Sequence, residues 1–202
     1  MARTPKVVED RREQIIDAAL HVFSQKGFER TTNKDIADEA GITPGLIYHY
    51  FKSKEDLLKA AIEAHSPVGF VHSLPEQLLE QPPELFLRFM AQKILEITES
   101  EPFVRLLRIF LPEVIYNPGI TSFNLGAIQD VSEFLVNYLE GKMDSGELHR
   151  SDAALTLQVF TGSLFAFVIR RQILHDPLSL QYTQAEIVES VVSTILDGLC
   201  SS

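Results

Sequence analysis

The stretch Thr31–Lys54, with the sequence TTNKDIADEAGITPGLIYHYFKSK, decides the fold. Its residue pattern predicts a helix over Lys34–Ala40, a tight turn at Gly41 and a second helix that begins at Pro44. Glycine is favoured where a helix ends in a left-handed residue, and proline suits the first position of a helix because that position needs no N–H. We therefore expect two short helices joined by a short turn.

The two faces of the second helix differ in character. Ile47, Tyr50 and Phe51 recur at helical spacing and predict an inward stripe. The outward face of this helix carries a glycine and two aromatic residues with polar tips. An ordinary surface helix would carry pairs of Glu and Lys there. A helix pair joined by a glycine-containing turn is the unit in which the second helix enters the major groove of DNA, and an ordinary helical corner is the alternative. The outward face favours DNA reading.

The longer stretch TTNKDIADEAGITPGLIYHYFKSKEDLL resembles the N-terminal DNA-binding domain of the TetR family of bacterial transcriptional regulators, over roughly residues 10 to 62. The resemblance implies that Gly45 allows close approach to the groove and that Tyr48 and Lys54 hold phosphates. Leu46 stands where the family often has a polar residue, and we expect it to touch a thymine methyl. The predicted DNA-binding residues are Thr32, Thr43, Pro44, Gly45, Leu46, Tyr48, His49 and Lys54.

The flanking segments predict where this domain ends. A helix over Glu9–Lys26 braces the helix pair, and a further helix over Ser53–His65 links it to the rest of the chain. Ser66-Pro67 breaks the helical pattern, and three more prolines follow within 16 residues. We therefore predict a DNA-binding domain over residues 1–65 and an effector-binding and dimerisation domain over residues 66–202.

The charge distribution is compatible with this division. The chain has a net charge of −10, which is unusual for a DNA-binding protein. Residues 1–65 hold 10 Lys and Arg against 11 Asp and Glu, whereas residues 66–202 hold 8 against 17. Nearly all of the excess negative charge lies outside the predicted DNA-binding domain, where it weakens only the long-range attraction to DNA.

The remainder of the chain predicts an all-α protein of about nine or ten helices, because no segment shows sustained strand alternation. Ten of the 13 phenylalanines lie after residue 65. Ordinary core packing accounts for each one singly, but as a group they suit an apolar small-molecule cavity, which the family resemblance also implies. The predicted effector-binding residues are Phe89, Met90, Phe110, Phe123 and Phe165.

Two C-terminal helices predict a homodimer. The helix over Asp152–His175 is apolar on nearly all sides in its middle, so one face needs a partner beyond its own domain. The helix over Gln184–Leu199 carries a second broad apolar stripe. Two such helices from each chain would form a four-helix bundle around a two-fold axis, although a central position in a monomer core is the alternative. The predicted interface residues are Phe160, Leu164, Phe167, Val188, Val191 and Ile195.

Motifs of other chemistry were not found in the sequence. There is no phosphate-binding loop, no HExxH, no GxSxG and no dinucleotide fingerprint, so we expect no catalytic residues and no cofactor. The single cysteine offers no zinc cluster, and we expect no metal site. No signal sequence is visible, which favours a cytoplasmic protein. We predict a dimeric, ligand-responsive transcriptional repressor released from a palindromic operator by an apolar molecule, with an enzyme using the bundle cavity or a helical adaptor as alternatives.

Overall fold

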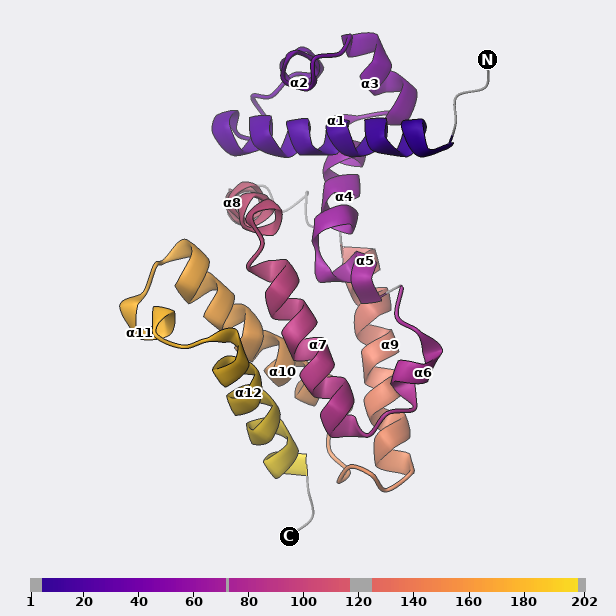
Figure 1. Ribbon diagram of the computed structural model, residues 1–202, viewed down its shortest axis with the longest axis vertical. Helices are drawn as coiled ribbons and strands as arrows, with labels where there is room; N and C mark the ends of the chain where they lie inside the picture. Colours follow the sequence, from indigo (N-terminus) through magenta and orange to yellow (C-terminus); the bar gives the residue numbers. More distant parts are fainter. Residues whose placement is uncertain (1–4, 72, 117–124, 200–202) are drawn as a thin grey trace. The chain divides into compact units, whose positions relative to one another are not determined.

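The computed structural model describes residues 5–71, 73–116 and 125–199, and all regular secondary structure in these residues is helical (Figure 1). An all-α fold with an N-terminal helix-turn-helix was predicted and is confirmed. The described helices are α1 (Pro5–Lys26), α2 (Asn33–Ala40), α3 (Pro44–Tyr50), α4 (Lys54–His65), α5 (Pro67–Val71), α6 (Glu76–Leu79), α7 (Pro83–Thr98), α8 (Glu101–Tyr116), α9 (Leu125–Asp144), α10 (Ala153–Val168), α11 (Pro177–Leu180) and α12 (Gln184–Leu199). Short α5 and α11 were not predicted, because helices of four or five residues have too few positions to show a period.

The chain forms two compact units, and the first combines α1–α4 with α8. Helix α1 packs against α2, α4 and α8, and α2 packs against α3. In Figure 1, α2 and α3 lie together along one side of α1. The core is built from residues on the inner faces of the helices together with Phe28 from the turn after α1, and each is less than 10% exposed: Ile15, Ile16, Ala19, Phe23, Phe28, Ile36, Ile47, Leu57, Ala61, Val104 and Leu107. Burial of this stripe holds the two short helices, which are too short to be stable alone.

Helix α8 is longer than the sequence indicates. Pro112 lies inside α8, which continues through this proline to Tyr116. Proline removes one backbone hydrogen bond and usually ends or kinks a helix. Here the apolar face before it, with Phe103, Leu106 and Ile109 buried, packs on its own compact unit and compensates for the loss.

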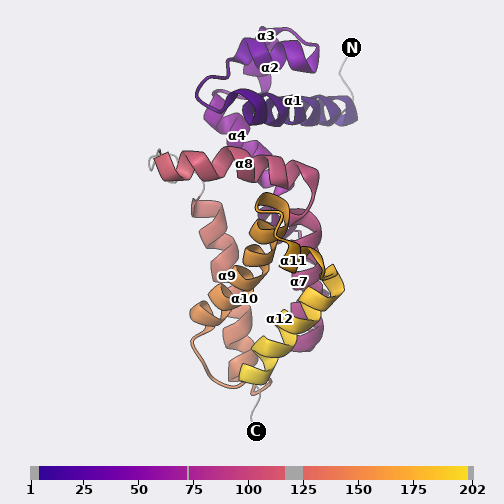
Figure 2. The same ribbon diagram turned by 90° about the vertical axis from the view of Figure 1, so that its left-hand side faces the viewer.

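The second compact unit combines α5–α7 with α9–α12. Helix α7 contacts both α10 and α12, which also contact each other. Figure 2 shows α7, α10 and α12 packed together, with α9 alongside. Helix α10 continues into a short π-helix, η2 (Ile169–Ile173), in which the N–H of Leu174 donates to the carbonyl of Ile169.

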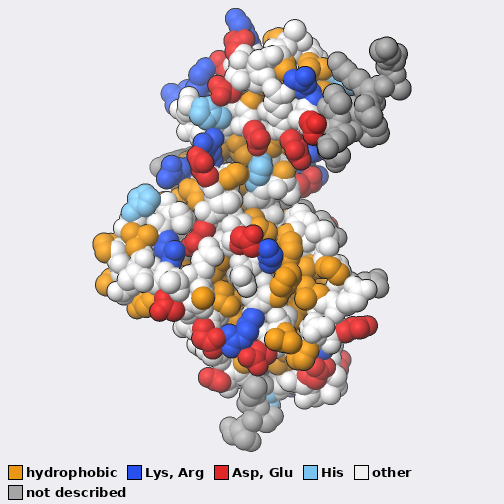
Figure 3. Space-filling model, in the orientation of Figure 1, with side chains coloured by type: hydrophobic (Ala, Val, Ile, Leu, Met, Phe, Trp, Pro, Cys, Tyr) orange, Lys and Arg blue, Asp and Glu red, His pale blue; other side chains and the backbone are white. Residues whose placement is uncertain are grey.

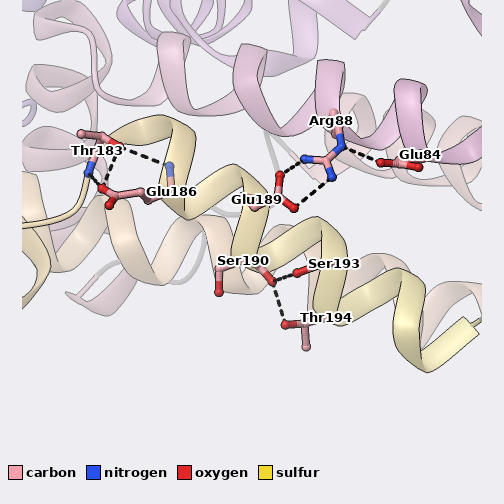
Figure 4. Close-up of polar contacts among 8 residues, drawn as sticks. All are labelled: Glu84, Arg88, Thr183, Glu186, Glu189, Ser190, Ser193 and Thr194. Carbon is pink, nitrogen blue, oxygen red and sulfur yellow. Dashed lines mark hydrogen bonds and ion pairs between the residues drawn. The ribbon is translucent and has the colours of Figure 1, made fainter.

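Polar contacts join distant segments of this second unit. Arg88 on α7 pairs with Glu84 one turn earlier and with both carboxylate oxygens of Glu189 on α12 (Figure 4). A second link is largely buried: Arg171 of η2 pairs with Glu99 at 2.7 Å, and the side chains are 14% and 9% exposed. The exposed pair therefore joins α7 to α12, and the buried pair joins the end of α7 to η2.

Candidate nucleic-acid interface and ligand cavity

The start of α2 is fixed by a reciprocal cap. Thr32 has extended backbone angles, and its hydroxyl accepts a hydrogen bond from the N–H of Asp35 while the Asp35 carboxylate accepts from the N–H of Thr32 at 2.9 Å. The Thr32 hydroxyl also donates to this carboxylate. A hydrogen bond from Lys26, followed by those from Thr32, holds the pKa of Asp35 well below its usual value. The hydroxyl proton of Thr32 is therefore committed to the cap, and a phosphate contact by Thr32 stays a prediction.

The turn between α2 and α3 has the predicted form. Gly41 adopts φ 64° and ψ 37°, the left-handed region in which a side chain is strained. Its N–H donates to Asp38, and the N–H of Ile42 donates back to Ala37 at 2.9 Å. These bonds satisfy carbonyls at the end of α2 and set the angle at which α3 leaves.

Helix α3 presents the outward face that the sequence predicts. Ile47 and the following Phe51 are 1% and 5% exposed, so they anchor the helix to the core. Tyr48 is 62% exposed, and the other exposed residues of this face are Pro44, Gly45 and His49, with Leu46 half-buried at its edge. An added Cβ at Gly45 would meet no atom within 4 Å, so nothing within the protein requires glycine there.

Two polar residues beside α3 behave differently from expectation. Thr43 occupies the N-cap position of α3, but its side chain makes no capping bond, which leaves the hydroxyl at the exposed start of the helix. Lys54 was expected to hold a phosphate, but its ammonium donates to the carbonyls of Phe28 at 2.9 Å and Glu29 at 3.2 Å. Lysine has three N–H donors, so at most one remains for DNA while Lys54 makes both hydrogen bonds, which we call the Lys54 clamp.

The second unit contains a small apolar cavity of about 10 Å³, roughly the size of one water. Its lining comes from α7, α9, α10 and α12: Phe86, Leu87, Met90, Leu135, Tyr138, Leu139, Thr156, Leu157, Phe160 and Ile195. A bound small molecule would require these side chains or helices to move apart.

Of the predicted effector residues, only Met90 lines this cavity. Phe89 is half-buried and packs against Phe70 with ring centroids 6.0 Å apart, and Phe165 is 39% exposed. Phe110 lies on α8 in the other compact unit, and Phe123 lies outside the described residues. The effector residues were predicted because they are aromatic or apolar. Which face of a helix points inward, however, is decided by the helices that pack against it. The sequence did contain a signal for the cavity lining on α9. It is the helical spacing, by three and four residues, of Leu135, Tyr138 and Leu139.

The predicted interface residues are mostly core residues of a single chain. Phe160, Leu164, Val188, Val191 and Ile195 are all at most 9% exposed, because α10 and α12 turn these side chains toward each other and toward α7. A side chain already covered by its own chain offers little area to a second copy. Phe167 alone is half-buried. The list of interface residues stays a prediction, and the burial of its other members is explained by the core of a single chain.

Other apolar residues of α10 are exposed instead. Leu155 and Val159 are 61% and 56% exposed, and Gly162 and Ala166 follow on the same face at helical spacing. By length and composition alone, Ala153–Ile173 is apolar enough to cross a membrane, and 28% of its apolar window is buried. Figure 3 shows further hydrophobic side chains gathered near α11, where Leu174 and Leu178 are about two-thirds exposed.

Metal chemistry has no evident place among the described residues, where no group of three or more His, Cys, Asp or Glu side chains could hold an ion. The nearest arrangement is a pair: His65 lies 3.4 Å from the carboxylate of Asp17. No Asp, Glu, Lys, Arg or His side chain lines the apolar cavity.

Comparison with known proteins agrees with the fold. Residues 15–61 match the profile of bacterial regulatory proteins of the tetR family, and residues 86–198 match the C-terminal domain of AefR-like transcriptional repressors. The transcriptional regulator YvkB of Bacillus subtilis (strain 168) is 24% identical, with 93% of this chain and 96% of that protein covered. The fatty acid metabolism regulator protein of the same organism is 26% identical over 92% of this chain and 94% of its own.

A solved structure has the same arrangement of helices. The transcriptional regulator FadR from Bacillus subtilis, in complex with stearoyl-CoA, matches with a TM-score of 0.76 at 23% identity, covering 93% of this chain and 99% of that one. The two profile matches together span most of the chain, and both describe regulators. The chain belongs to the TetR family of bacterial regulatory proteins, and it is a ligand-responsive, DNA-binding transcriptional regulator and not an enzyme.

Proposed function

We propose that two copies of this chain bind a palindromic DNA operator as a repressor and that a small molecule with a long apolar chain releases them. The observation that carries the DNA part is the exposed face of α3, with Tyr48 and His49 outward and Gly45 in open space. Each α3 reads one half-site in the major groove. Such a regulator acts in the cytoplasm, where the bacterial chromosome lies.

The exposed apolar face of α10 supports the dimer. Leu155, Val159, Gly162 and Ala166 form one stripe, and the small residues let a second helix approach closely. The outward face of α12 adds Ser193 and Thr194, whose hydroxyls both donate to the backbone carbonyl of Ser190 on the same helix (Figure 4). An obligate interface of this kind buries roughly 2,000 Å² or more in total.

The effector class is supported by the names of similar proteins. The Bacillus subtilis relative is a fatty acid metabolism regulator, and the similar FadR structure holds stearoyl-CoA. The cavity here is lined by Phe86, Met90 and Leu135 among other apolar groups, and its volume of about 10 Å³ is far too small for an acyl chain. Ligand binding must therefore favour a second arrangement of the helices. DNA and effector then weaken each other's binding by the same factor, because the coupling is reciprocal.

The experiment has two steps. The operator is first selected from random-sequence DNA by gel shift, and a palindrome with two half-sites is expected. Long-chain acyl-CoA and free CoA are then titrated into the complex. Release by acyl-CoA at concentrations at which CoA has no effect supports the proposal. Selected DNA without two-fold symmetry, or a complex indifferent to every apolar compound tested, would refute it.

A further inference from the structure

Tyr138 on α9 lies between two spaces. Its ring stacks on Phe86 with centroids 3.9 Å apart and forms part of the small apolar cavity. It also lines an open groove of about 410 Å³ beside α6 and the end of α9. The groove is formed by Leu79, Phe134, Asn137, Tyr138, Gly141, Lys142, Ser145 and Glu147. Tyr138 is the one residue that both linings share.

The helical spacing of α9 explains this position. Leu135 and Leu139 face the cavity, whereas Phe134, Asn137 and Gly141 face the groove. Residues three or four apart lie on one face of a helix, so these are two adjacent faces that meet at Tyr138. The Tyr138 ring is therefore the partition between groove and cavity.

The hydroxyl of Tyr138 is buried and has no hydrogen-bond partner in the described protein. Burial, with a smaller contribution from Glu147, raises the pKa of Tyr138, so the hydroxyl remains a protonated donor at neutral pH. Buried hydroxyls in native proteins nearly always have a partner. An unpaired donor at the wall of a groove indicates an acceptor supplied from outside the chain.

A cation lies beside this donor. The Lys142 side chain is 13% exposed, and its ammonium lies 5.8 Å from the centroid of the Tyr138 ring. Glu147 holds the ammonium with both carboxylate oxygens at 3.1 Å, and Ser145 donates to one of them. Two of the three donors of Lys142 are thus used, and the third remains for a ligand oxygen.

We propose that this groove binds the oxygen-bearing head of an amphiphile, a carboxylate or carbonyl attached to an apolar chain. The head accepts a hydrogen bond from Tyr138 and lies near the Lys142 ammonium. The apolar chain enters between the helices when the Tyr138 ring leaves Phe86 and the helices around the cavity move apart, so the ring is a gate as well as a donor. This assignment rests on the proposed response to an apolar effector and adds the group that recognises its polar end.

The test uses the full-length dimer and three probes with a ten-carbon chain: decanoate, decan-1-ol and decyltrimethylammonium. Calorimetric titration should show decanoate binding to the wild type. Tyr138→Phe should weaken it about tenfold or more, the loss of one hydrogen bond to a charged acceptor. Tyr182→Phe is the matched control, because its exposed ring lies outside both spaces and binding should be unchanged. Lys142→Gln should weaken decanoate more than decan-1-ol, and the ammonium probe should bind worst.

Stability separates this role from a structural one. Without probe, Tyr138→Phe should melt at the same temperature as the wild type or higher, because it removes an unpaired hydroxyl. A lower melting temperature would mean that an ordered water already satisfies the hydroxyl, and would overturn the proposal. So would equal decanoate affinity in Tyr138→Phe, or no binding of decanoate to the wild type. If decanoate binds through Tyr138 but leaves DNA affinity unchanged, the proposed effector response fails and the groove assignment stands.

Discussion

The ammonium of Lys54 donates a hydrogen bond to the backbone carbonyl of Phe28 and lies 4.8 Å from the centroid of the Phe28 ring. One side chain at the start of α4 thus closes the loop that leads into α2. Any DNA contact made by Lys54 depends on the same ammonium, so its structural and functional contributions must be measured separately.

We expect Lys54→Met to lower the free energy of unfolding by about 1–2 kcal/mol, because it removes two partly exposed hydrogen bonds and a cation–π contact. Urea unfolding followed by circular dichroism measures this. Lys59→Met, on the exposed face of the same helix, should change stability by less than about 0.5 kcal/mol. Identical unfolding midpoints for both variants would show that the contacts of Lys54 with Phe28 and Glu29 do not contribute to stability.

Gly45→Ala separates folding from DNA reading. An added methyl group has open space in the protein, and alanine favours helix, so stability should stay equal or rise by up to about 1 kcal/mol. Operator affinity should nevertheless fall, because the methyl group meets the DNA backbone or a base. Fluorescence anisotropy with labelled operator measures the affinity. Gly198→Ala on α12, also in open space, should leave it unchanged. If Gly45→Ala binds as tightly as the wild type, α3 does not approach the groove at this residue.

Tyr48→Phe and Leu46→Ala should affect DNA binding in different ways. Loss of the Tyr48 hydroxyl should weaken binding to all sequences alike, about tenfold or less, because a phosphate contact carries no sequence information. Leu46→Ala should relax the preference at one base pair, which is worth about 1–3 kcal/mol of discrimination. Competition against single-base operator variants tells these effects apart. A Tyr48→Phe variant with altered sequence preference would contradict the assignment.

Asp35 should make stability depend on acid pH. Its pKa is lowered in the folded protein, chiefly by Lys26, so the folded state binds this proton less readily than the unfolded state. The resulting stability is present above the unfolded pKa of about 3.9 and is lost as the pH falls toward the lower folded value. The stability difference between wild type and Asp35→Asn should therefore shrink as the pH falls below about 4. Asp38→Asn, at an exposed position of the same helix, is the matched control variant.

The dimer is tested on the exposed stripe of α10. Val159→Glu should yield folded monomers that lose operator binding, because a charge in a closely packed interface is not solvated. Sedimentation velocity measures the oligomeric state. Leu85→Glu, at a similarly exposed position on α7, should remain dimeric. Val191→Glu should instead unfold the protein, since Val191 is buried within one chain. A dimeric Val159→Glu protein would place the interface elsewhere.

The helix-turn-helix was predictable because its determinants are local. The caps at Thr32 and Ser53 and the left-handed Gly41 each act within a few residues, so the sequence pattern states them directly. Thr43 also stands at an N-cap position, but its side chain makes no capping bond. In α10, by contrast, apolar residues surround the helix, and only packing against α7 and α12 decides that Leu164 is buried while Leu155 is exposed.

The small-molecule cavity stays a prediction, because the apolar cavity among the described residues has a volume of only about 10 Å³. Wide apolar residues do line it, yet Phe110 and Phe165 were assigned to it and Tyr138 was not. Phe110 was misplaced because α8 follows α7 in sequence but packs with α1 and α4. Such non-local packing is set by the sum of many weak contacts, which no motif in α8 encodes.

The membership of α8 in the first compact unit has a consequence for synthesis. The apolar residues of α1 that contact α8 stay uncovered until the ribosome has made the chain to about Tyr116, some 50 residues after α4 ends. At typical elongation rates of 5–20 residues per second, this interval is about 3–10 s. During this interval α5–α7 are synthesised, and the core of the DNA-binding unit lacks the residues of α8. A gene encoding only the first 66 residues would leave it permanently in that unfinished state.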